Sequence, residues 1–234
     1  IEEANEALSK GTSGVTITST TDLTAPSTLE IPNAFGHGTS TSVEIEQPVS
    51  TDLTISEKTT SDKELPETLS VEMETTASLI VDTPNLTVSL EGTYTTVEAT
   101  TAENTLIVAK NTVIETLTVK KGNVKIYGTV GEIVNEGTGK IIRCIDAQDE
   151  VERTLADTRC DHILIEKPAG TLDFGGGTTT KQICVEASVT IANLIVSPEK
   201  EHPVMVSGDN VKLTLDGVKL VCNAAKTYAV NCLD

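Results

Sequence analysis

The sequence predicts an all-β chain folded as a β-solenoid, an elongated stack of coils, and three observations support this. Short runs alternate apolar and polar residues with a period of two, as strands do when one face is buried. These runs lie close together, separated by turn-like residues. Aromatic residues make up only 2% of the 234 residues, so a narrow interior of Val, Ile, Leu and Thr fits better than the wide, aromatic-filled core of a β-sandwich. The clearest alternating runs are 69–73, 86–90, 117–119, 124–126 and 213–215.

The first element is a predicted helix over residues 2–10. Ala4, Ala7 and Leu8 fall on one face of this helix, and Gly11 supplies a stop. Strands are predicted directly after it, at 15–18 and 29–32.

A second helix is predicted over residues 147–156, with Asp146 as its N-cap and with Val151 and Leu155 on one face. Strands follow again, at 162–165 and 171–174. We expect each helix to cover the open end of a coil stack, because uncovered edge strands pair with other chains.

The repeated order of helix and strands predicts two modules. The first is a helix-capped β-helix over 1–143, and the second is another over 144–234. Residues 228–234 resemble a strand entering a further coil, so we expect the second module to continue beyond Asp234.

Between the two helices, short strands and turns alternate. Two or three strands would make one coil of about 20–30 residues. The stretch 47–67 is rich in Ser, Thr, Asp, Glu and Lys, and is predicted to be a protruding loop or a poorly ordered coil. The strands are predicted at 69–73, 79–81, 86–90, 106–109, 116–119, 124–127, 132–134 and 140–143, and the turns at 82–85, 91–92, 103–104, 121–123 and 136–139.

The alternative fold is a pair of tandem β-sandwiches. Asp216-Gly217 stands between the alternating runs 213–215 and 218–220, and this is a hairpin signal. Such signals are few elsewhere, so the solenoid is the preferred prediction.

Residues 102–108 and 117–130 resemble uncharacterised surface or secreted proteins of gut Bacteroidetes. Those proteins have a right-handed parallel β-helix of the pectate-lyase type. The resemblance covers most of the chain, most strongly 69–143, and residues 213–218 are similar to coils of the same superfamily. It implies an exported β-helix on the outside of a bacterial outer membrane, and it implies no activity.

Net charge and cysteine content restrict the partners. The formal net charge of −18 would repel nucleic acid, and the longest basic run is Lys120-Lys121. No apolar run approaches the ~20 residues needed to span a bilayer. The five cysteines have no regular spacing and are odd in number, which argues against a disulfide framework.

The sequence lacks the carboxylate pairs of glycoside hydrolases. Gly36-His37-Gly38 is similar to a tripeptide of β-helix polygalacturonases, but the paired aspartates that hydrolysis needs are missing. We therefore interpret His37 as a loop histidine. Cys160 and His162 flank Asp161, yet adjacent strand residues point to opposite faces and cannot easily share a metal.

Lyase chemistry is equally unsupported, because pectate lyases use an arginine beside Ca²⁺ held by acidic side chains. The three arginines, Arg143, Arg153 and Arg159, cluster around the second predicted helix. Ca²⁺ takes six to eight oxygen ligands. Isolated aspartates could touch it, but we interpret them as solvated side chains and predict no catalytic residue, metal site or cofactor. These aspartates are Asp173, Asp209 and Asp216.

Sugar sites usually stack a ring on an aromatic side chain. Tyr94, Tyr127 and Tyr228 are available, and Tyr127 is the binding candidate, expected to point outward because Val124 and Ile126 point inward. We expect a non-catalytic extracellular module that is structural, adhesive or weakly glycan- or protein-binding, with polysaccharide or a surface protein as partner. The alternative is part of a polysaccharide lyase or glycoside hydrolase whose catalytic coils lie outside this chain.

Overall fold

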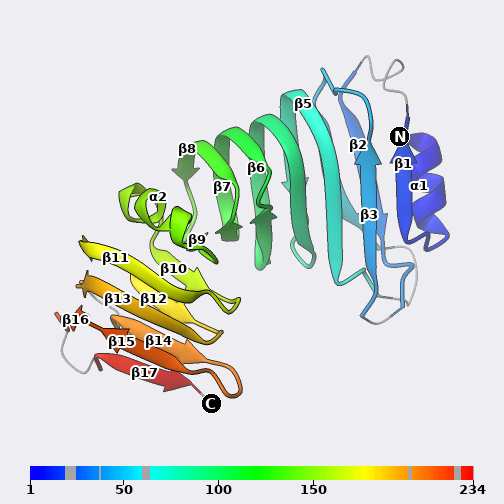
Figure 1. The fold of residues 1–234 in the computed structure, drawn as a ribbon. Helices are drawn as coiled ribbons and strands as arrows, with labels where there is room; N and C mark the ends of the chain where they lie inside the picture. Colours follow the sequence, from blue (N-terminus) through cyan, green and yellow to red (C-terminus); the bar gives the residue numbers. More distant parts are fainter. Residues whose placement is uncertain (19–24, 37, 60–63, 200–201, 224–227, 234) are drawn as a thin grey trace. The chain divides into compact units, whose positions relative to one another are not determined.

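A computed structural model describes residues 1–18, 25–36, 38–59, 64–199, 202–223 and 228–233. The fold is a parallel β-solenoid with two short α-helices, which confirms the predicted fold class (Figure 1). The ladders between neighbouring strands are parallel in both parts of the chain, so the tandem β-sandwich alternative is wrong.

Internal contacts divide the chain into unit 1, Ile1–Gly139, and unit 2, Lys140–Asp234. The proposed modules 1–143 and 144–234 stay a prediction. Unit 1 holds α1 (Glu2–Ser9), β1 (Gly14–Ile17), β2 (Ser27–Pro32), β3 (Ser40–Ile45), β4 (Leu53–Lys58), β5 (Thr68–Asp82), β6 (Thr87–Val108), β7 (Val113–Ile126) and β8 (Thr129–Asn135).

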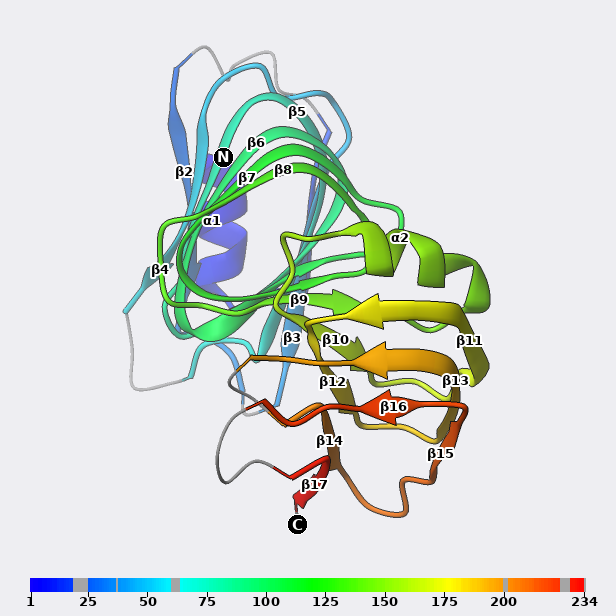
Figure 2. The ribbon, with the colours of Figure 1, turned by 90° about the vertical axis from the view of Figure 1, so that its left-hand side faces the viewer.

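The strands of unit 1 form two main rows, in which each strand pairs with the strand one coil later. One row runs β1–β3–β5, and the other runs β2–β4–β5. The long strands β5, β6 and β7 take part in both rows, because each bends at a corner of its coil and continues along the next face (Figure 2).

These bends correct three predicted turns. Residues 91–92 and 103–104 lie inside β6, and residues 121–123 lie inside β7. Gly92 shows the reason: its φ of +112° turns the strand, while Gly92 stays in register with Met73 of the previous coil. A Cβ at Gly92 would lie 2.1 Å from the Met73 carbonyl oxygen, so only glycine fits.

The prediction of a loop or coil over 47–67 is wrong at β4, Leu53–Lys58, and residues 60–63 of this stretch lie outside the described residues. Leu53 and Ile55 are buried and pair with Leu79 and Val81 of β5. The alternation Leu53-Thr54-Ile55 is short and is hidden among many polar residues, but burying its two apolar side chains is enough to hold a strand against an existing row.

The interior of unit 1 follows the predicted alternation. The predicted inward-facing residues are all fully buried, whereas Thr87, Thr118 and Lys125 are half-exposed. The buried set is Val71, Leu86, Val88, Leu106, Leu117, Val119, Val124 and Ile126.

Helix α1 packs on β1 and β2 through the predicted face. Ala4 and Leu8 are buried and Ala7 is half-buried. The helix stops at Gly11, whose φ is +77° and whose N–H donates to the Leu8 carbonyl at 2.8 Å.

Unit 2 repeats the arrangement with shorter strands. One row is β9–β10–β12–β14–β17, and the second is β11–β13–β15, with β16 also pairing with β13. Its elements are β9 (Ile141–Cys144), a 3₁₀ turn η1 (Gln148–Glu150), α2 (Val151–Ala156), β10 (His162–Ile165), β11 (Gly170–Thr179), β12 (Gln182–Val185), β13 (Val189–Val196), β14 (Val204–Ser207), β15 (Leu213–Asp216), β16 (Lys219–Leu220) and β17 (Val230–Leu233).

Asp216-Gly217 does not form the hairpin that it would form in a β-sandwich. β15 and β16 both pair in parallel with β13, so the chain turns a corner at Gly217 and continues in the same sense. Gly217 has a φ of +62°, which permits this corner.

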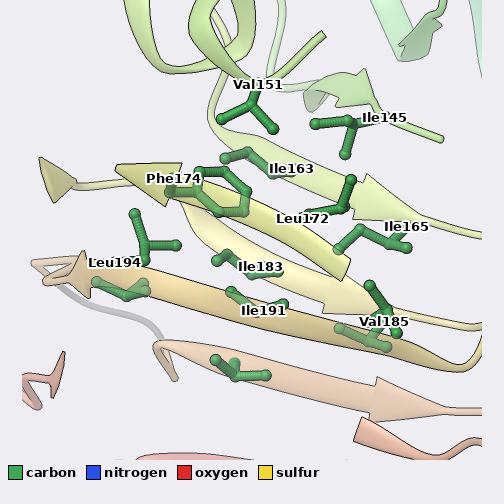
Figure 3. Packing of buried hydrophobic residues seen from close by; sticks show 13 residues of the cluster. Ile145, Val151, Ile163, Ile165, Leu172, Phe174, Ile183, Val185, Ile191 and Leu194 are labelled. Atoms are coloured by element: carbon green, nitrogen blue, oxygen red, sulfur yellow. The ribbon is translucent and has the colours of Figure 1, made fainter. Parts of the chain in front are cut away.

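The core of unit 2 lies between its two rows, with α2 over β11. Val151 of α2 points toward Ile163 and Phe174, and Ile183 and Ile191 lie in the following layers (Figure 3). Leu155 packs on the same cluster. A Cβ at Gly177 would lie 2.6 Å from Leu155 Cδ1, so the absence of a side chain there lets α2 approach β11.

The predicted N-cap of the second helix is wrong. Ala147 precedes η1 and Glu150 precedes α2, and neither makes a side-chain cap hydrogen bond. Asp146 instead donates its backbone N–H to Glu150 Oε2 at 2.9 Å. The Glu150 side chain thus reaches back across η1 to the backbone of Asp146. The 3₁₀ turn η1 lies between Asp146 and α2, so Asp146 is not next to the first residue of the helix.

Candidate functional site

Of the three tyrosines, Tyr94 is part of the interior. Its ring is fully buried, and its hydroxyl donates to the Glu91 carbonyl at 2.8 Å. Burial, with the nearby Glu91 and Glu72 charges, raises the pKa of Tyr94 well above its usual range. Tyr94 is therefore a structural residue.

The binding candidate Tyr127 lies in the bend between β7 and β8. Its backbone N–H donates to the Val108 carbonyl at 2.9 Å, and its side chain is half-buried. Val124 and Ile126 point inward as expected. Because the Tyr127 side chain is partly covered, it offers a ligand less surface than a free-standing ring would.

Tyr228 is the most exposed large aromatic side chain among the described residues, at 68%. Its ring stacks on His202, with centroids 5.8 Å apart and planes 12° apart. Its backbone N–H donates to His202 Nδ1 at 2.8 Å, which fixes the imidazole behind the ring. His202 and Tyr228 lie one coil apart, each two residues before a strand in register with the other, β14 and β17.

This stack ends a row of polar residues that we call the polar corner: Lys140, His162, Gln182, His202 and Tyr228. Lys140 Nζ lies 3.2 Å from His162 Nε2, and His162 is in register with Gln182. Gln182 Nε2 donates to the His202 carbonyl at 2.8 Å. The corner therefore runs through successive coils of unit 2.

A repeated pair, a polar residue followed by isoleucine, marks this corner in the sequence. Lys140, His162 and Gln182 each stand directly before an isoleucine that begins or lies in a strand, and the intervals between them are similar. His162 and His202, which the sequence places in different segments, thus lie on one corner. They are separated by Gln182, so they do not form a pair.

Within the polar corner, His162 and Gln182 are buried, whereas Lys140 and Tyr228 are exposed and His202 is half-buried. Its members include no carboxylate, whereas glycosidic cleavage needs two. The exposed ring of Tyr228 is an apolar surface beside the half-buried imidazole of His202.

Cys160 is not a nucleophile in this structure. It is 4% exposed, and burial, with the neighbouring Asp157 charge, raises its pKa to about 12, so it is a thiol at neutral pH. Cys160 and Asp161 precede β10, and Asp161 is exposed whereas Cys160 and His162 are buried. Asp161 Oδ2 accepts the Ile141 N–H at 3.2 Å.

Lys181 lies in the same buried region beneath α2. Its ammonium is hydrogen-bonded to the carbonyls of Thr154 at 3.1 Å and Leu155 at 3.3 Å, the last turn of the helix. Burial lowers the pKa of Lys181 and also that of the buried Arg143 guanidinium. The Lys181 ammonium therefore stabilises the last turn of α2.

The aspartates considered for Ca²⁺ do not converge. Asp173 and Asp216 lie on strands either side of β13, both in register with Ala192. Asp173 Oδ1 accepts the Gly175 N–H at 2.9 Å and the Asn193 amide at 3.0 Å, and these bonds lower its pKa. Within the described ranges, no group of three or more His, Cys, Asp or Glu side chains could hold a metal ion. His37 lies outside the described residues.

The outer face of unit 1 carries a row of carboxylates. Glu44, Glu72 and Glu91 are exposed and in register on β3, β5 and β6. Neighbouring strands lie about 4.8 Å apart, so these like charges repel each other and also repel an approaching anion.

No family model, no curated protein and no solved structure matches this chain. In the part of the chain that the structure describes, neither helix is long and apolar enough to cross a membrane.

Proposed function

We propose that this chain is a non-catalytic module of an extracellular or cell-surface protein, which attaches weakly to a neutral glycan through the polar corner of unit 2. The observation that carries the proposal is the exposed Tyr228 ring held against His202. A fixed ring loses little conformational freedom on binding, so it can contribute even in a shallow site.

The charge of the chain supports a neutral ligand. The net charge of −18 and the row of Glu44, Glu72 and Glu91 both disfavour acidic polysaccharides. The extracellular location rests on the resemblance of residues 102–108 and 117–130 to exported bacterial β-helix proteins.

A non-catalytic role is favoured over the enzyme alternative by the state of the reactive side chains. Cys160 is a buried thiol, and the Arg143 guanidinium on β9 is also buried, so neither side chain is open to a polysaccharide. The polar corner has hydrogen-bonding groups but no acid and base pair.

Affinity electrophoresis in gels that contain neutral polysaccharides or polyuronides tests the proposal. We expect a neutral polysaccharide to retard the chain, and Tyr228→Ala to weaken that retardation about three- to tenfold, the usual contribution of an aromatic contact. The matched control is Tyr127→Ala, which removes a half-buried ring from unit 1 and should change retardation little.

A reducing-sugar assay on the same polysaccharides should show no product. Retardation that both tyrosine variants leave intact would refute the polar corner as the site. Release of reducing ends by the purified chain would refute the non-catalytic assignment.

A further inference from the structure

The contact between the imidazole of His202 and the backbone of Tyr228 is made through a single atom. His202 Nδ1 lies 2.8 Å from the Tyr228 nitrogen and 3.1 Å from the Tyr228 carbonyl oxygen. One of these backbone groups is a donor and the other is an acceptor. Nδ1 can therefore hold Tyr228 in two ways, and the presence or absence of a proton on Nδ1 decides between them.

The neutral imidazole suits the shorter of the two contacts. When its proton is on Nε2, the lone pair of Nδ1 accepts the Tyr228 N–H, and the carbonyl oxygen receives no hydrogen bond from Nδ1. A separation of 2.8 Å is at the short end of the usual range for an N–H donor. The geometry thus fits a neutral His202 whose proton is on Nε2.

The protonated imidazole cannot keep that contact. Both ring nitrogens then carry a hydrogen, so the hydrogen on Nδ1 would meet the hydrogen of the Tyr228 N–H across 2.8 Å. The imidazolium can instead donate from Nδ1 to the Tyr228 carbonyl, which is already near. The Tyr228 nitrogen must then move away from Nδ1, and the position of the Tyr228 ring changes with it.

The described contacts of His202 involve no charged side chain. From the β12 side, Gln182 donates to the His202 carbonyl, while Lys181, one residue earlier, directs its ammonium to the last turn of α2. From the β17 side, Tyr228 supplies its backbone groups and its ring. On the segment of His202 itself, Glu199 is exposed. Among the described residues no carboxylate pairs with His202, so a second proton acts on the contact with Tyr228.

The strand that follows Tyr228 is held by bonds that do not titrate. The Val204 N–H donates to the Ala229 carbonyl, and Val230 begins the parallel ladder between β14 and β17. These backbone bonds remain the same whether or not His202 is protonated. A change at His202 should therefore move Tyr228 while β17 stays in place.

We propose that His202 is a proton-dependent latch on Tyr228. The neutral imidazole holds the Tyr228 N–H and fixes the exposed ring, and the protonated imidazole releases that N–H and shifts the ring. Histidine is the side chain that ordinarily changes its charge between pH 8 and pH 5. The latch concerns the site of the proposed function and rests on it in one respect: if the fixed ring contributes to attachment, acidification weakens attachment to a neutral glycan.

Nuclear magnetic resonance of the isotope-labelled chain from pH 8 to pH 5 tests the latch without a ligand. We expect an unprotonated Nδ1 at pH 8, and a Tyr228 amide proton resonance that moves upfield as His202 gains its second proton. The matched control is His202→Asn, because Asn Oδ1 can replace Nδ1 as an acceptor and does not titrate, so the Tyr228 resonance should stay constant. A proton on Nδ1 at pH 8 would overturn the proposal, and so would a Tyr228 resonance that ignores pH in the wild type or follows it equally in His202→Asn.

Affinity electrophoresis in neutral polysaccharide at pH 8 and pH 5, measured against gels without polysaccharide, tests the consequence for attachment. Wild-type retardation should fall about two- to tenfold at pH 5, the range expected for the loss of one hydrogen bond. His202→Asn lacks the stacked imidazole, so it should be retarded less than wild type at pH 8 but equally at both pH values. Equal wild-type retardation at both pH values would overturn the link to attachment. No retardation at either pH would refute the proposed function, while the Tyr228 resonance still decides the latch.

Discussion

Each unit has one short α-helix near its start, α1 before every strand of unit 1 and α2 after β9 in unit 2, but the two helices are held differently. Helix α1 lies on unit 1 through Ala4 and Leu8, and its ion pair, Lys10 with Glu6, is exposed. Helix α2 is shorter, and the buried Lys181 binds its last turn. A short helix has little apolar surface, so α2 combines burial of Val151 with buried hydrogen bonds from Lys181 to its last turn.

The coils also differ in length within each unit. In unit 1, the coil that joins Ser42 to its partner Ser70 is longer than the coil that joins Val113 to its partner Thr129. In unit 2, the coil from His162 to Gln182 is shorter than the coil from Val204 to Val230. The two units therefore share a ladder pattern but not a fixed repeat length.

The largest expected effect tests whether both units share one rule of alternation. Val119→Asp in unit 1 and Ile191→Asp in unit 2 each bury an unpaired charge, so we expect each to lower the free energy of unfolding by about 3–5 kcal/mol. Their outward-facing neighbours, Thr118→Asp and Thr190→Asp, should cost less than about 1 kcal/mol. Urea denaturation measures all four, and equal losses within either pair would contradict the period-two assignment.

The second prediction tests the difference between the helices. Lys181→Met leaves the carbonyls of Thr154 and Leu155 without their charged donor in a buried place, so we expect a loss of about 1–3 kcal/mol. Lys10→Met removes an exposed ion pair from α1 and should change the free energy of unfolding little. Thermal denaturation by circular dichroism compares them. Similar losses for both variants would mean that the two helices are held alike.

The smallest effect concerns pH. The folded pKa of Cys160, about 12, lies above the usual thiol value, so the protonated thiol stabilises the fold below pH 9 and this stability is lost as pH rises toward 12. The slope from this group is at most about 1.4 kcal/mol per pH unit. Urea midpoints under reducing conditions from pH 8 to 11 should fall less steeply in Cys160→Ala than in wild type. Parallel slopes would show that Cys160 does not contribute.

The fold could be predicted because the alternation of apolar and polar residues within a single strand decides which side chains are buried. The strand pattern at 69–73 and 124–126 is local, and so is the apolar face of Ala4 and Leu8. The strand β4 was missed because only Leu53 and Ile55 stand out among polar residues. The sequence predicted several short strands where the structure has the single long strand β6. This strand is continuous because its backbone hydrogen-bonds to the previous coil, and a local sequence pattern does not reveal such bonds.

The candidate site could be predicted less well because it depends on contacts between coils. His202 and Tyr228 lie far apart in the sequence, and coil length in unit 2 varies, so no fixed spacing places them together. The amide of Gln148 bonds backbone groups of Asp173 in a later segment, where any residue would present the same atoms. A side chain that binds backbone atoms places no requirement on the residue type at the other end of the contact, so the sequence does not reveal such a contact.

The parallel ladder of unit 2 also has a mechanical consequence. Each of its later strands is held mainly by the strand one coil before it, through β10, β12, β14 and β17 in turn. Tension applied at β17 would load one short ladder at a time rather than shear the whole row together. The unit would then lengthen in steps, and a coil of roughly 20 residues would release about 70 Å of extended chain at each step.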